Sequence, residues 1–282
     1  MKSLRLPELP GPIGVFDSGY GGLTILKELR RKLPEYDYLY LGDNARAPYG
    51  TRSFDIIYHY TLEAVTALFH QGCHLVILAC NTASAKALRT IQQKNLPKID
   101  SHRRVLGVIR PTAECIGPLT HTRHIGILAT TGTINSKSYE MEIKKLHPDI
   151  HVEGLACPMW VPLVENFELD GAGTDYFVKK SLEELMEKDH NIDTIILGCT
   201  HYPLLLPLIQ KHLSSKIKVI AQGEYIASSL QEYLHRHPEM ADKCTRDGTC
   251  HYLTTENNII FDHSACRFMQ HDVQSQHIEL TY

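Results

Sequence analysis

The sequence predicts an α/β protein made of two pseudo-symmetric α/β domains, with mostly parallel sheets, helices on both faces and the functional site in the cleft between the domains. Short apolar runs rich in Val, Ile and Leu alternate with longer amphipathic stretches, which is the pattern of βαβ units. Two of these runs are repeated further along the chain, which indicates an internal duplication. Ligands of such sheets bind beyond the carboxyl ends of the strands.

Eight apolar runs are expected to form the strands. In chain order they are PIGVFDSG, YDYLYLGDN, HLVILACNT, RVLGVIRP, HIGILATTG, IHVEGLACP, TIILGCTH and KVIAQGE. Each run ends in small or polar residues, so these ends are the places to look for a site.

A helical pattern covers residues 53–71 and starts at Ser53, a favoured N-cap residue. Its apolar positions recur at helical spacing and share one face. They are Ile57, Tyr60, Ala64 and Leu68.

Size and composition are those of an ordinary globular protein. The chain has 282 residues, 22% of them charged, and a formal net charge of -3, which gives no electrostatic reason to expect a nucleic-acid partner. The start, MKSLRLPELPGP, has prolines and a glutamate where a secretory signal needs an apolar run, and no stretch reaches the ~18 to 20 apolar residues of a membrane span. We therefore expect a cytoplasmic protein without membrane contact.

The eight cysteines are expected to be reduced thiols. Without an export signal, so few cysteines in so long a chain do not indicate a disulfide scaffold. Reduced thiols are able to carry out acid-base chemistry.

Two pairs of strand ends repeat at similar offsets. IGVFDSG begins at Ile13 and IGILATTG at Ile125, 112 positions later. LVILACNT and TIILGCTH contain Cys80 and Cys199, which are 119 positions apart. The offsets indicate two related halves, each with a cysteine at the end of a strand.

Two cysteines on opposite sides of a cleft suit the inversion of a carbon that bears a proton. One thiolate removes the proton from one face while the opposite thiol delivers another. The start of a helix favours a thiolate, and Asn81, Thr82 and Thr200 offer donors for a carboxylate. Asp17 and His201 are candidates for adjusting the proton affinity of the thiols.

Each of these features also has a structural interpretation. A single cysteine most often serves packing, and Asp17 would serve equally well in a helix cap or a turn. The run GYGG lacks the Lys-Ser/Thr ending of a Walker motif and the spacing of a dinucleotide fingerprint, which argues against a nucleotide site. The matched pair of cysteines favours function.

Five motifs, in the same order, resemble those of the cofactor-independent glutamate racemases. They are FDSGYGGL, GDNARAPYG, ACNTAS, ACPMWVPLVE and GCTHYPLL. The resemblance extends from about Ile13 to the segment YLTTENNIIFDHSACRFM. It implies interconversion of L- and D-glutamate, to supply D-glutamate for peptidoglycan, with no cofactor and no metal.

The resemblance also implies the site residues. It assigns Cys80 to the proton of the D-enantiomer and Cys199 to that of the L-enantiomer. Asp17 would assist the first thiol, and Glu165 and His201 would act near the second. The implied substrate-binding residues are Asp17, Ser18, Tyr49, Gly50, Asn81, Thr82, Thr200 and His201.

By the same resemblance the first half is completed by the C-terminal segment. We expect a first domain of residues 1–101 plus 211–282, a second domain of residues 102–210, and a homodimer. Two places depart from the family pattern, Arg110 in GVIRPTAE and Ala221-Gln222 in VIAQGE. They bear on the edge of the cleft and on rate rather than on the type of reaction.

Four other interpretations remain open. The first is a metal module formed by Cys244, Cys250, His251, His263 and Cys266, although their spacing lacks the paired knuckles of structural zinc sites. The second is a cysteine hydrolase using Cys199 and His201, although residues two apart at a strand end are expected to be poorly placed to hydrogen-bond. The third and fourth are a racemase of another acidic amino acid and a non-catalytic binding protein on the same scaffold.

Overall fold

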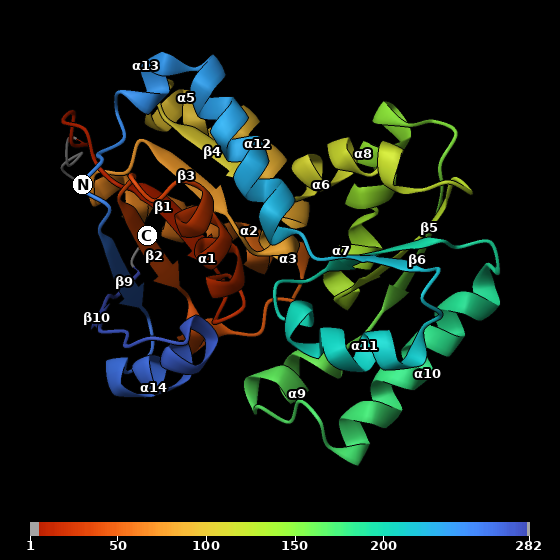
Figure 1. Ribbon diagram of the computed structural model, residues 1–282. Coiled ribbons are helices and arrows are strands. Elements are labelled where there is room, and N and C mark those ends of the chain that lie inside the picture. The colour runs from red at the N-terminus through yellow and green to blue at the C-terminus, as the bar shows by residue number, and fades with distance from the viewer. Residues whose placement is uncertain (1–5, 281–282) are drawn as a thin grey trace.

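The computed structural model describes residues 6–280, and its strands form two separate sheets (Figure 1). One sheet contains β1 (Ile13–Asp17), β2 (Tyr38–Gly42), β3 (Leu75–Leu78), β4 (Arg104–Gly107), β9 (Cys250–Thr254) and β10 (Ser275–His277). The other contains β5 (His124–Ala129), β6 (His151–Ala156), β7 (Thr194–Gly198) and β8 (Lys218–Ile220). All pairings within both sheets are parallel. The predicted α/β class is confirmed.

The strand orders are β10-β9-β2-β1-β3-β4 and β6-β5-β7-β8. Strands β1, β3 and β7 therefore lie inside their sheets, and all residues of these three strands are buried. Burial on both faces explains why they are continuous apolar runs. Their carboxyl ends lead to Asp17, Cys80 and Cys199 respectively.

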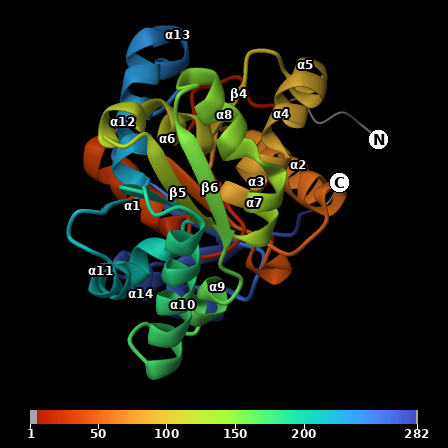
Figure 2. The same ribbon diagram turned by 90° about the vertical axis from the view of Figure 1, so that its right-hand side faces the viewer.

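Helices cover both sheets, as Figure 2 shows for the second one. Those that precede β5 are α1 (Leu23–Lys32), α2 (Phe54–His70), α3 (Asn81–Lys86), α4 (Leu88–Thr90), the π-helix Ile91–Asn95, α5 (Leu96–Ile99) and α6 (Ile109–Cys115). Those after β5 are α7 (Thr131–Ser136), α8 (Ser138–Leu146), α9 (Trp160–Glu165), α10 (Ala172–Lys188), α11 (Leu206–His212), α12 (Gly223–Arg236), α13 (Pro238–Ala241) and α14 (Asn258–Met269). Short 3-10 helices cover Asn44–Arg46, Gly117–Leu119 and Tyr202–Leu205.

Helix α2 confirms the pattern predicted for residues 53–71. The Ser53 side chain accepts a hydrogen bond from the backbone N–H of Ile56 at 3.5 Å, as an N-cap does. Ile57, Ala64 and Leu68 are buried, and Tyr60, the fourth residue expected on this face, is partly buried and packs against the same core. The apolar spacing thus identified the face of the helix that packs on the sheet.

The eight expected strands are all present, but two of them lie in the sheet opposite to the one expected. A second domain of residues 102–210 would contain β4 and exclude β8. Instead β4 pairs with β3 of the first sheet, and β8 pairs with β7 of the second. Each strand continues its sheet outward before the chain crosses to the other half.

Strands β9 and β10 were not expected from the sequence. Their sequences, CHYLT and SQH, lack a continuous apolar run. Pairing with the buried strand β2 places β9 in the sheet.

Among the described residues, no helix is both long enough and apolar enough to cross a bilayer.

Candidate active site

The two halves meet where the central strands end. The hydroxyl of Thr200, which follows β7, donates to Oδ1 of Asp17 at the end of β1, at 3.5 Å. The hydroxyl of Thr24 donates to the backbone carbonyl of Thr200 at 3.0 Å. Side chains expected to act on one substrate therefore come from both sheets.

Cys80 occupies the N-cap position of α3, and its side chain is almost closed off from solvent, with 5% exposed. Its sulfur accepts from the Ala83 N–H at 3.4 Å and lies 3.5 Å from the Ser18 hydroxyl. Burial, and after it the charge of Asp17, raises the pKa of the Cys80 thiol to about 12, although the Ser18 and Ala83 hydrogen bonds act to lower it. The expectation that the helix start favours a thiolate is therefore wrong for Cys80, because desolvation is the larger effect.

Cys199, His201 and Glu165 form a chain of three groups on the other side. The sulfur of Cys199 lies 3.8 Å from Nδ1 of His201, and Nε2 of the same ring lies 3.0 Å from Oε1 of Glu165. The expectation that Cys199 and His201 are poorly placed to hydrogen-bond is wrong, because the turn after β7 brings the ring back to the sulfur.

The charge of His201 follows from these contacts. Burial lowers its pKa, but the hydrogen bonds to Cys199 and Glu165 outweigh burial and raise the pKa to about 10. The ring is thus a cation at neutral pH, buried between the sulfur of Cys199 and the carboxylate of Glu165. Such a group can hold or move a proton at the sulfur of Cys199.

Asp17 is completely buried, and burial raises the pKa of its carboxyl group. Its Oδ2 accepts from the Gly19 N–H at 2.9 Å. The glycine run beside it allows the two halves to approach closely. A Cβ atom on Gly21 would lie only 2.2 Å from the Thr200 hydroxyl and 2.5 Å from Nδ1 of His201.

The predicted substrate-binding residues lie at this junction, but their side chains are not equally available. Tyr49 is 1% exposed, and its hydroxyl donates to Asp43, so its side chain supports the site from behind. The carbonyl of Gly50 accepts from the Gly132 N–H at 2.8 Å, a contact between the halves. The hydroxyl of Thr82 lies 2.9 Å from that of Thr130.

Gln222, at a position where the sequence departs from the family pattern, also belongs to this junction. It is 2% exposed and lies between β8 and α12. Its carbonyl accepts from the Asn81 amide at 2.8 Å, and its own amide donates to Thr112 at 2.7 Å and to Tyr139. The buried side chain of Gln222 is thus bonded to three helices, and it joins Asn81, the residue after Cys80, to the second half.

The proposed C-terminal metal module is not supported by the geometry. Within the part of the chain that the structure describes, the side chains grouped closely enough to hold an ion are His124, His151 and Asp189, far from that segment in sequence. All eight cysteines are free thiols, as expected.

Comparison with known proteins identifies the family. The model of the Asp/Glu/hydantoin racemase family matches residues 23–230. The chain belongs to this racemase family. It is 38% identical to the glutamate racemase of Ruegeria sp. (strain TM1040) over 271 residues, which is 93% of this chain and 97% of that protein. It is 35% identical to the glutamate racemase of Streptococcus thermophilus (strain ATCC BAA-491 / LMD-9) over 270 residues, 95% of this chain and 96% of that one.

Solved structures of glutamate racemases share the whole fold. Isoform RacE1 from Bacillus anthracis matches with a TM-score of 0.87 and 35% identity, over 96% of this chain and 98% of that one. The enzyme from Francisella tularensis, in complex with D-glutamate, matches with a TM-score of 0.83 and 33% identity, over 97% and 98%. The protein is thus an amino-acid racemase, and the hydrolase and non-catalytic interpretations are set aside.

Proposed function

We propose that this racemase interconverts L- and D-glutamate, to supply D-glutamate for peptidoglycan, with Cys80 and Cys199 as its two acid-base groups. The observation that carries the proposal is the position of the two thiols. Each follows a central strand of a different sheet. The Asp17–Thr200 contact joins the end of β7 to the end of β1, the parallel neighbour of the strand that leads to Cys80. The relatives named above, which are glutamate racemases, support glutamate as the substrate.

In the direction from L to D, the Cys199 thiolate takes the α-proton of L-glutamate. His201 stands beside this sulfur, and Glu165 holds the ring in place. Cys80 then delivers its own proton to the opposite face of the carbon. Its pKa of about 12 keeps this thiol protonated at rest, which is the form that this direction needs. Afterwards Cys199 is a thiol and Cys80 a thiolate, as the reverse direction requires.

Glutamate brings two carboxylates and an ammonium group. In the proposal Asn81, Thr82 and Thr200 hold the carboxylates through short polar groups. Ser18 and Gly50 contribute to the same pocket from the first half, and the buried Tyr49 supports them from behind. The two thiols are 5% and 6% exposed, so the halves separate to admit substrate and close to exclude water.

We also propose two domains whose limits follow the sheets. The first contains β1 to β4 with β9 and β10, and the second contains β5 to β8. The crossings then fall after Gly107 and after Ile220, six and ten residues beyond the limits of 101 and 210 expected from the sequence. The homodimer and the cytoplasmic location stay predictions, which sedimentation velocity and cell fractionation test.

The deciding experiment follows the α-proton of each enantiomer in deuterium oxide. With wild-type protein, each enantiomer should exchange this proton, and the glutamate solution should lose its optical rotation. Cys80→Ser should exchange L-glutamate without racemising it, and Cys199→Ser should do the same for D-glutamate only. Cys115→Ser, a half-buried thiol on α6, is the matched control and should behave as wild type.

Two results would contradict the proposal. Absence of exchange in folded wild-type protein would reject glutamate as the substrate. Full racemisation by both serine variants would reject the two-thiol mechanism while leaving the substrate intact.

A further inference from the structure

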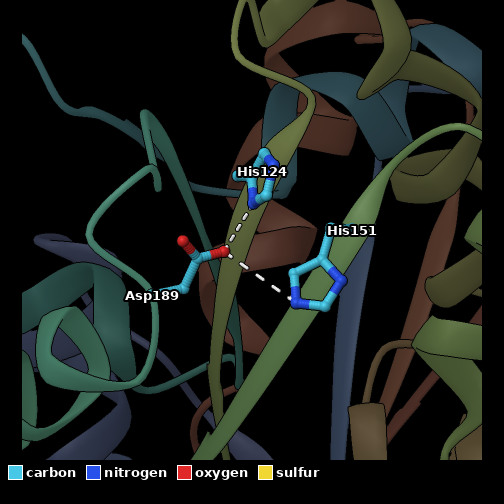
Figure 3. A group of neighbouring side chains, drawn as sticks. All are labelled: His124, His151 and Asp189. Carbon is cyan, nitrogen blue, oxygen red and sulfur yellow. Dashed lines mark hydrogen bonds and ion pairs between the residues drawn. The ribbon is translucent and has the colours of Figure 1, made fainter.

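Two imidazoles and a carboxylate converge at the end of the second sheet remote from the thiols. His124 is the first residue of β5 and His151 the first of β6, and the two are register partners in the parallel pair. Asp189 follows the last residue of α10. Figure 3 shows both rings turned toward the Asp189 carboxylate.

The three potential ligand atoms lie close to one another. Oδ2 of Asp189 is 2.6 Å from Nδ1 of His124 and 3.9 Å from Nε2 of His151, and all three atoms lie within 4.8 Å of one another. Ligand atoms around a tetrahedral Zn²⁺ lie roughly 3.3 Å apart when the bonds are about 2.0 to 2.1 Å. The first separation must widen and the second must shorten, each by less than 1 Å. The third, between the two ring nitrogens, is at most 4.8 Å and must shorten by up to about 1.5 Å.

The surroundings are suited to that adjustment. His151 keeps 54% of its side chain exposed, so its ring is free to turn, whereas Asp189 is 9% exposed. The second oxygen of Asp189 accepts from the Asn191 N–H at 2.9 Å, which fixes the carboxylate. Oε1 of Glu153 lies 3.1 Å from Nε2 of His151 and is available as a fourth ligand.

We propose that His124, His151 and Asp189 bind a divalent transition-metal ion of the Zn²⁺ type, with Glu153 or water in the fourth position. Imidazole nitrogen and carboxylate oxygen are a donor set that Zn²⁺, Ni²⁺ and Co²⁺ accept. The ion links the beginnings of β5 and β6 to the end of α10. Its effect is therefore on the stability of the second half.

The site is separate from the chemistry of racemisation. Strands β5 and β7 are parallel neighbours; His124 begins β5, whereas Cys199 follows the last residue of β7. The ion thus sits beyond the amino ends of the strands and the thiols beyond the carboxyl ends. Catalysis does not require the ion.

The test uses Co²⁺ as a spectroscopic probe and Zn²⁺ as its competitor, on the full chain. Because the thiols also bind these metals, the bands of thiolate coordination are recorded separately from those of nitrogen and oxygen coordination. Wild-type protein should bind one Co²⁺ without thiolate bands, and Zn²⁺ should displace it. At Zn²⁺ a hundredfold above its Kd, the melting temperature should rise by about 5 to 10 °C.

His151→Ala and Asp189→Asn should abolish two effects. These are the Co²⁺ signal that lacks thiolate bands and the rise in melting temperature caused by Zn²⁺. His151 is exposed, so its alanine variant is expected to fold. His235→Ala removes an exposed histidine of α12 and should keep both effects. Absence of this signal in wild type would show a hydrogen-bonded His–Asp pair with no metal affinity and would overturn the proposal. A signal that is unchanged in His151→Ala would overturn it equally.

Discussion

His201 joins two groups of opposite character: its Nε2 lies 3.0 Å from Oε1 of Glu165, and its Nδ1 lies 3.8 Å from the sulfur of Cys199. The ring is 4% exposed. A buried cation held by a carboxylate on one side leaves its other nitrogen directed at the sulfur of Cys199. We therefore expect Glu165 to be a positioning residue, which acts on the substrate through His201.

Glu165→Gln should reduce racemisation by about 10- to 100-fold, because the ring loses the carboxylate that holds its proton. The pKa of His201, raised to about 10 in the wild type, should fall in the variant. The readout that separates this role from a packing role is the pH profile of kcat, whose limb assigned to His201 should move to lower pH. A parallel drop at all pH values would indicate a structural defect instead.

The contact between Glu165 and His201 makes the stability of the folded protein depend on pH. The folded-state pKa of His201 lies above its ordinary value of 6.5. The protonated ring therefore stabilises the folded state fully below about pH 6.5, and this stabilisation is lost as the pH rises through about 10. The melting temperatures of wild type and Glu165→Gln should therefore differ by a few degrees at pH 6 and converge above pH 10. A constant difference across this range would contradict the assignment.

Gly21→Ala should inactivate the protein. The added Cβ would lie 2.2 Å from the Thr200 hydroxyl and 2.5 Å from Nδ1 of His201, so the two halves cannot approach as they do here. A loss of at least about 100-fold in kcat is expected from such a displacement. Gly173→Ala is the control: nothing lies within 4 Å of its Cβ, and it should stabilise α10 by about 0.5 to 1 kcal/mol with full activity.

Gln222→Ala should destabilise the protein by about 1 to 3 kcal/mol, because Asn81, Thr112 and Tyr139 lose a buried partner. The freed Asn81 side chain should also raise the KM for glutamate. Chemical denaturation and steady-state kinetics measure the two effects. Gln231→Ala, exposed on the adjoining helix α12, should change stability by less than about 0.5 kcal/mol.

Alkylation of Cys80 in the absence of substrate should be slow and should keep rising with pH. With a thiol pKa of about 12, the thiolate fraction grows about tenfold for each pH unit between 7 and 10. Mass spectrometry of the peptide containing Cys80 gives the rate. Ser18→Ala should slow it further, because the Ser18 hydrogen bond lowers this pKa; a plateau near pH 8 would contradict the burial argument.

Much of the fold was predictable because buried parallel strands are continuous apolar runs. LVIL of β3 and TIILG of β7 are of this kind. The sequence CHYLT of β9 is not, because its polar residues interrupt the apolar run and its Cys250 and His251 resemble part of a metal-binding segment. Its place in the sheet depends on β2, more than 200 residues earlier, and no local pattern contains that information.

The residues of the candidate site could be named from the sequence, but their charges could not. Cys80 and His201 are recognisable from the motifs around them, whereas their proton affinities depend on burial and on partners such as Asp17 and Glu165. Gln222 was missed as a connecting residue because an isolated glutamine carries no pattern. Only the packing of α3, α6 and α8 around it reveals its partners.

The pairing of β9 with β2 has a consequence for the order in which the molecule is built. During synthesis all strands of the second sheet leave the ribosome before β9 and β10 exist. The second sheet can therefore fold first, while the first sheet, with Asp17 and Cys80, waits for the last residues of the chain. A nascent or truncated chain ending before β9 would expose one side of β2, an unpaired strand edge open to aggregation.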